Sequence, residues 1–150
     1  MDINQMLNSE ILEERVEAIM IILTKEEMEE TKLEIRKEIE ELDIEISEFE
    51  EELREKIQEE KEYEEELVEV RILKKELRSK DILLAKEMKE LVELENNMPY
   101  VERELEEIKE HINYLEEEIE DVRIQILQHE EEMRTLDKAL EKVLESRVVV

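Results

Sequence analysis

The chain has two histidines, His111 and His129, and these are its best candidates for metal or acid–base chemistry. A di-iron centre in a helical bundle uses inward-facing Glu-x-x-His pairs, but the residues three before these histidines are Ile108 and Ile126. Zinc sites need clustered His, Cys or carboxylate ligands at fixed spacing, and the chain has no cysteine. We therefore expect no metal, no other cofactor, no small-molecule substrate and no enzymatic activity.

The composition predicts an all-α protein. The chain of 150 residues has no glycine and one proline, and 47% of it is charged. Folds with strands and tight turns use glycine where the backbone needs a positive φ. Enrichment in helix formers with a heptad spacing of apolar residues is typical of coiled coils.

The formal net charge of −27 limits the classes of partner. Nucleic-acid binding needs clustered Lys and Arg to contact phosphates, and anionic membranes attract basic segments, so we expect neither partner. The longest apolar run, AIMIIL at residues 18–23, is far shorter than the roughly 20 residues that span a bilayer. The N-terminus lacks the basic and apolar regions of a signal peptide. We expect a cytoplasmic protein.

Two heptad frames cover most of the chain. The first runs from Ile35 to Leu91, with 13 of its 17 a and d positions apolar, and the second from Met98 to Val143, with 13 of 14. The frames differ in phase, and the slip falls on the segment of residues 95–98 before Pro99. Proline costs about 3 kcal/mol in a helix interior but almost nothing in a first turn. The slip therefore predicts a chain reversal at 95–98, and a kinked continuous helix is the alternative.

The predicted architecture is a short N-terminal helix followed by a long antiparallel coiled-coil hairpin, with helices at 25–94 and 99–147. In this hairpin Glu60 faces His129, the one polar seam residue of the second helix, and the two form a candidate register-setting pair. His111 is expected on the flank, as a surface residue.

Residues 1–24 form a separate segment that could oligomerise or dock. An apolar stripe at 4-3-4 spacing predicts a helix at about 9–22. The sequence Thr24-Lys25-Glu26-Glu27 fits a capping box, with Leu23 and Met28 placed for a hydrophobic staple. A turn or kink is therefore predicted at 23–25, before the long helix.

Apolar and basic residues outside the seam predict an interaction surface. A two-stranded coil does not need these apolar side chains, so the N-terminal helix, a second copy or another protein is expected to cover them. The stretch RILKKELRSK (71–80) adds five basic residues against one glutamate. The predicted surface comprises Ile19, Ile22, Leu23, Val68, Ile72, Leu73, Lys75, Arg78, Ile82, Leu83, Val92 and Leu94.

These patterns favour a non-enzymatic structural or adaptor protein that self-associates into a dimer or larger oligomer and binds other proteins through helix faces. The alternative is an acidic inhibitor or chaperone whose carboxylates imitate a phosphate backbone and bind a basic or nucleic-acid-binding protein. Outward-facing glutamates are also the ordinary solvated face of a coiled coil.

Overall fold

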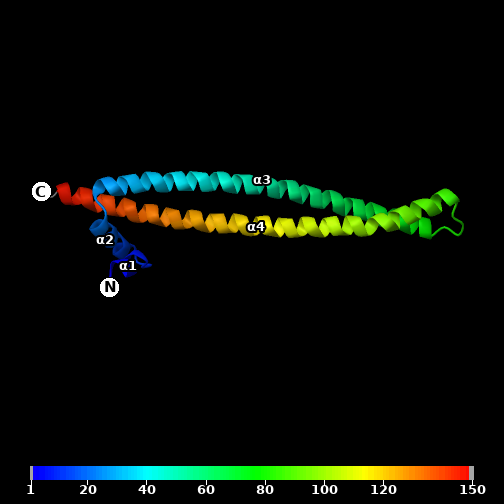
Figure 1. Cartoon of the computed structure of the whole chain (residues 1–150), viewed down its shortest axis with the longest axis horizontal. Coiled ribbons are helices and arrows are strands. Elements are labelled where there is room, and N and C mark those ends of the chain that lie inside the picture. The colour runs from blue at the N-terminus through cyan, green and yellow to red at the C-terminus, as the bar shows by residue number, and fades with distance from the viewer. Residues whose placement is uncertain (1, 149–150) are drawn as a thin grey trace. The chain divides into compact units, whose positions relative to one another are not determined.

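The computed structural model describes residues 2–148, with side chains for residues 2–145. All regular structure in this range is helical and comprises α1 (Ile3–Leu7), α2 (Leu12–Ile22), α3 (Lys25–Arg78) and α4 (Ala85–Val148) (Figure 1). The helix α3 packs against α4 as a helical hairpin, which confirms the predicted all-α hairpin. The chain divides into two compact units: residues up to Ser47 with those from Glu120 onward form unit 1, and Glu48–Ile119 form unit 2.

Unit 1 is built from α1, α2, the first part of α3 and the last part of α4. Its core contains side chains from α2, α3 and α4 that are almost fully removed from solvent, namely Val16, Met28, Ile35, Leu136 and Ala139. Burying a Val, Met, Ile or Leu side chain, as in all of these but Ala139, stabilises a fold by about 1.5–3 kcal/mol each. The amphipathic helix α2 therefore adds a third helix to the α3–α4 pair within this unit.

The predicted start of the long helix is confirmed. The backbone N–H of Glu27 donates to Thr24 Oγ1 at 3.2 Å, and the N–H of Thr24 donates to Glu27 Oε1 at 3.3 Å. This is the capping box read from the sequence, and Leu23 and Met28 share the unit 1 core as the staple requires. A second capping box, between Asp2 and Gln5, begins α1, a helix that the sequence analysis missed.

Unit 2 holds the end of α3, the loop of residues 79–84 and the beginning of α4. Side chains from both helices make its seam, with Leu67 packed against Val101 and Leu105. Glu64 lies 3.9 Å from Lys109 Nζ, while Glu52, earlier in α3, lies 3.0 Å from the later His111. Residues earlier in α3 thus contact residues later in α4, so the two helices run antiparallel. Further seam residues are buried at Leu77, Ile108, Ile112, Leu115 and Ile119.

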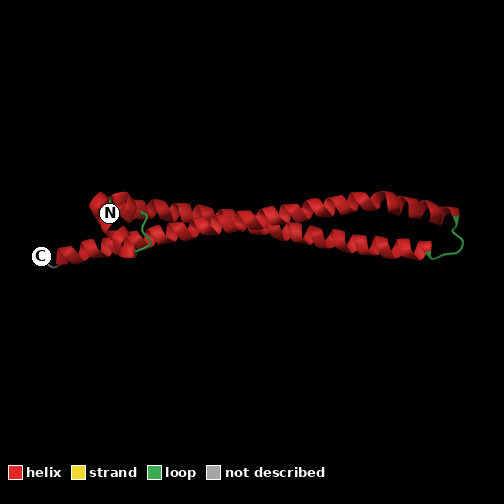
Figure 2. Cartoon of the chain, turned by 90° about the horizontal axis from the view of Figure 1, so that it is seen from below, coloured by secondary structure: helices red, strands yellow, loops and turns green. Residues whose placement is uncertain are grey.

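The predicted turn at 95–98 is wrong, because the chain reverses at residues 79–84 (Figure 2). Helix α3 ends at Arg78 instead of 94, α4 begins at Ala85 instead of 99, and Pro99 lies inside α4. At the end of α3 the Ser79 hydroxyl donates to the Glu76 carbonyl at 2.7 Å, which satisfies one of the acceptors that a helix end leaves open.

The predicted register is corrected together with the turn. Because the chain reverses at 79–84 and not at 95–98, each residue of α4 lies beside a residue of α3 that comes before its predicted partner in the sequence. His129 accordingly lies in unit 1, where its Nε2 is 3.3 Å from Glu38 and its Nδ1 is 3.4 Å from Glu132, rather than against Glu60. His129 is only partly exposed, so its predicted place in the seam of the second frame is retained.

Candidate functional site

The predicted interaction surface divides between the two units. In unit 1, Ile19 and Leu23 pack against the protein's own core, while Ile22 is exposed. The side chains of Ile19 and Leu23 therefore hold α2 in place. The remaining predicted residues belong to unit 2, close to its turn.

Apolar side chains near the turn of unit 2 are exposed in unusual number. Ile82, in the loop, is 83% exposed. Leu73, Leu83 and Leu94 are partly buried. The side chains that are more than half exposed in this region are Val68, Ile72, Ile82, Leu84, Met88 and Val92, and we call them the turn surface.

Two members of the turn surface, Leu84 and Met88, were assigned to the seam by sequence reasoning. The first frame places them at d and a positions, but the chain has already left α3 at Arg78. The partly buried residues at the beginning of α4 include Glu87, Leu91 and Leu94, which extend the second frame backward at the same 4-3 spacing. That continuation places Met88 outside the seam and could have revealed it as a surface residue. It places Leu84 at an a position, but Leu84 lies in the loop before α4 and is exposed.

Basic side chains surround the turn surface. Residues 71–89 contain seven Lys or Arg and three Asp or Glu, the reverse of the balance in the whole chain. Arg78 pairs with Glu95, and Lys74 Nζ lies 4.0 Å from the same carboxylate. Among the described residues no ion pair is found for Arg71, Lys75, Lys86 and Lys89. The predicted residue Lys75 is thus an exposed cation, while Arg78 is already paired.

One ion pair holds the turn together. Lys80, in the loop, donates to the carboxylate of Glu87 in the first turn of α4, and the N–H of Leu84 donates to Glu87 Oε1 at 3.3 Å. The hydrogen bond from Lys80 and then that from Leu84 lower the pKa of Glu87. A carboxylate near a helix N-terminus also complements the helix dipole. The loop that carries Ile82 is therefore tied to α4.

A groove of about 510 Å³ with acidic walls lies elsewhere in unit 2. Tyr63 is in this groove, and desolvation, followed by the charge of Glu104, raises the pKa of its hydroxyl. At its edge His111 contacts Glu52 and stacks edge-on against Tyr114, with ring centroids 6.2 Å apart. The groove is lined by Lys56, Glu59, Glu62, Tyr63, Glu104, Glu107, Ile108 and His111.

Unit 1 has a smaller cavity of about 250 Å³, with largely apolar walls that include Ile19, Ile35 and Leu136. Arg15 at its edge donates to the Ser9 carbonyl at 2.8 Å, to Thr135 Oγ1 at 3.2 Å and to Glu131 at 2.9 Å. Every one of these contacts joins parts of unit 1. Arg15, which sequence reasoning missed, therefore fixes α2 against α4.

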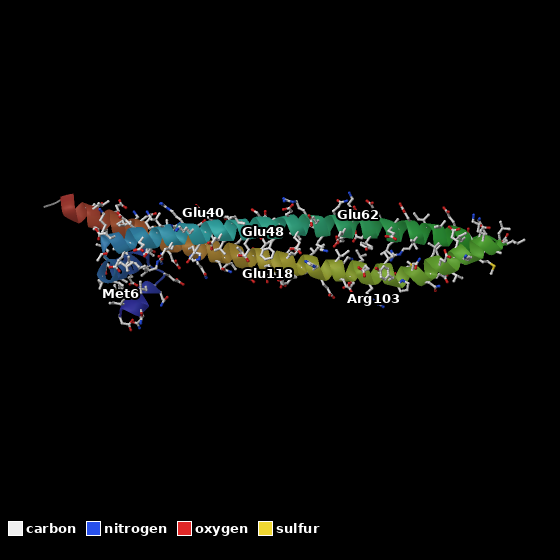
Figure 3. The ribbon with its side chains drawn as sticks, turned by 45° about the horizontal axis from the view of Figure 1, so that its top comes forward. Met6, Glu40, Glu48, Glu62, Arg103 and Glu118 are labelled. Carbon is white, nitrogen blue, oxygen red and sulfur yellow. The ribbon has the colours of Figure 1, made fainter. Side chains whose placement is uncertain are left out.

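The described residues contain neither a group of metal ligands nor a membrane-spanning helix. Within residues 2–145 no three His, Cys, Asp or Glu side chains are grouped so that they could hold a metal ion. No helix in the described range is long and apolar enough to cross a membrane. Exposed side chains such as Glu62 on α3 and Arg103 on α4 project outward from unit 2 (Figure 3).

Comparisons of the chain with protein-family models, with curated proteins and with solved structures find no match.

Proposed function

We propose that the chain is a non-enzymatic structural or adaptor protein of the cytoplasm that self-associates and binds other proteins through helix faces. One observation carries the proposal: six large apolar side chains beside the turn of unit 2 are more than half exposed. Scattered apolar residues are normal on protein surfaces, whereas a group of them is typical of an interaction site.

The size of the turn surface fits protein–protein contact. Fully burying a large apolar side chain contributes about 1.5–3 kcal/mol, so covering one that is already about half buried contributes roughly half of that. Association costs about 4–15 kcal/mol in lost freedom of motion. One or two side chains would not offset that cost, but several covered together would. A contact that covers most of the turn surface at once is therefore required, and another helix face can provide it.

Sedimentation equilibrium of the purified chain tests the proposal. One chain has a mass of 18.3 kDa, and we expect a weight-average mass that rises clearly above this value as the concentration increases. Part of the association should persist at high salt, because contact between apolar side chains is not screened. A mass of one chain at every concentration would contradict self-association.

An acidic inhibitor or chaperone remains the second candidate. The observation in its favour is the groove around Tyr63, where four of the eight lining side chains are glutamates. Such a groove would bind a basic segment of a client by charge complementarity. Polylysine is a suitable probe, and its binding should weaken steeply between low and high salt. Binding that does not change across a salt series would exclude this candidate.

A further inference from the structure

We propose that the turn surface of one copy docks on an acidic, outward-facing patch of α4 in unit 1 of a second copy, centred on Ile124 and Leu127. The inference rests on the proposed self-association and adds to it both halves of the contact. The turn region contributes exposed apolar and basic side chains, and the patch contributes exposed apolar and acidic ones.

The patch is apolar where packing inside the chain does not require it. Ile119, Val122 and Ile126 form the seam here and are buried or partly buried. Ile124 and Leu127 are exposed, since they lie three residues apart on the helix face that points away from this seam. Their side chains are available to another molecule.

Acidic residues bracket the apolar pair. Residues 116–132 contain eight Asp or Glu and one Arg. Glu120 and Asp121 lie one helical turn before Ile124, Glu130 lies one turn after Leu127, and all three are exposed. The patch thus combines apolar contact with negative charge, whereas the turn region combines apolar contact with positive charge.

The composition distinguishes this patch from other candidate partners. Two turn regions placed together would oppose like charges, which disfavours their contact. Elsewhere in the described chain, the exposed pair Ile21 and Ile22 of α2 has fewer carboxylates nearby. Among residues 2–145, whose side chains are described, the other large exposed apolar residues away from the turn, such as Ile44 and Ile57, have no exposed apolar neighbour three or four positions away. The patch around Ile124 and Leu127 has both features that complement the turn region: neighbouring exposed apolar side chains and nearby carboxylates.

Docking of one surface on a different surface has a consequence for assembly. Two copies related by two-fold symmetry can make this contact twice, each turn surface lying on the patch of the other copy, which closes a dimer. If only one contact forms, a turn surface and a patch stay free and the assembly grows until it closes into a ring or extends. The proposal therefore predicts a dimer or a larger species for the unchanged chain.

The test uses two variants with substitutions at exposed positions, Ile82→Ser in the turn surface and Leu127→Ser in the patch. Each variant alone loses one half of the contact and is expected to have an association constant about tenfold or more below that of the unchanged chain, as for buried residues at the centre of an interface. Mixed together, one variant supplies the patch and the other supplies the turn. The mixture should form a one-to-one dimer with twice the 18.3 kDa mass of one chain and stop there. Ile57→Ser, at a single exposed position, is the matched control and should change association less than about twofold.

Charge-reversal variants test the electrostatic part of the proposed contact. Lys75→Glu with Lys89→Glu should weaken association at low salt, as should Glu120→Lys with Asp121→Lys, and mixing these two double variants should restore it. The loss should largely disappear at high salt, where charges are screened. Lys61→Glu, at an exposed position away from the turn, is the control.

The outcomes separate the inference from the proposed function. If the unchanged chain associates and Leu127→Ser associates equally well, the patch is not the partner and the inference is wrong, while self-association stands. If Ile82→Ser has no effect, the turn surface is not used. If the unchanged chain stays a monomer, self-association and the inference fail together.

Discussion

Replacing Pro99 with alanine is expected to stabilise the folded chain by about 3 kcal/mol, the difference between the two residues in a helix interior. Pro99 lies within α4, 14 residues after its beginning at Ala85. Its nitrogen carries no hydrogen for the carbonyl of Glu95, and its ring crowds that carbonyl. Alanine removes both defects at an exposed position, so no packing is lost.

Thermal unfolding followed by circular dichroism measures this effect. For a chain of this size about 3 kcal/mol corresponds to a rise in Tm of roughly 6–12 °C. Pro99→Gly is the matched comparison, and its gain should be smaller by about 1 kcal/mol because glycine is a poorer helix former. An unchanged Tm for Pro99→Ala would mean that proline sits in a first helical turn, as a reversal at 95–98 requires.

Leu115→Ala is expected to lower the free energy of unfolding by about 2–5 kcal/mol. Leu115 is 1% exposed, and it lies on α4 between the other buried seam residues Ile112 and Ile119. Truncating it removes apolar contacts and leaves a cavity, because neighbouring side chains relax only in part. The same substitution at the exposed Leu33 should cost less than about 1 kcal/mol.

Urea unfolding of the two variants and the unchanged chain at one protein concentration gives the comparison, since self-association also adds to apparent stability. The seam assignment predicts a large loss for Leu115→Ala and a small one for Leu33→Ala. Equal losses would show that Leu115 does not lie in a packed seam.

The sequence predicted the parts of the fold that depend on local pattern. Thr24 and Glu27 form the predicted cap, and in the second heptad frame Val101, Leu105 and Leu115 are buried as their spacing required. These features succeed because a cap and a helical face are set by residues at most a few positions apart.

The position of the turn was not predicted, because Leu91 satisfies both frames. As a d position it prolongs the first frame, and as an a position it begins the second together with Leu94. Pro99 then made the later site look like the reversal. Asp81, a polar residue at a seam position of the first frame, marked the true one, but other polar seam residues such as Glu60 concealed it.

The candidate site was predicted in part. The heptad pattern identified Val68, Ile72 and Ile82 as apolar residues outside the seam, and all three are exposed. The pattern did not show that Ile19 and Leu23 pack into the protein's own core. Helical periodicity says which residues share a face, whereas the element that covers this face depends on where the chain turns.

The most direct test of the account is a probe at the turn. The chain has no cysteine, so Ile82→Cys provides a single thiol for a small fluorescent label. We expect iodide quenching of this label to decrease over the concentration range in which the sedimentation mass rises, while a label at Lys61→Cys stays equally quenched. If the mass rises and the label at position 82 remains fully accessible to iodide, the chain associates through another surface, and the role given to the turn is wrong.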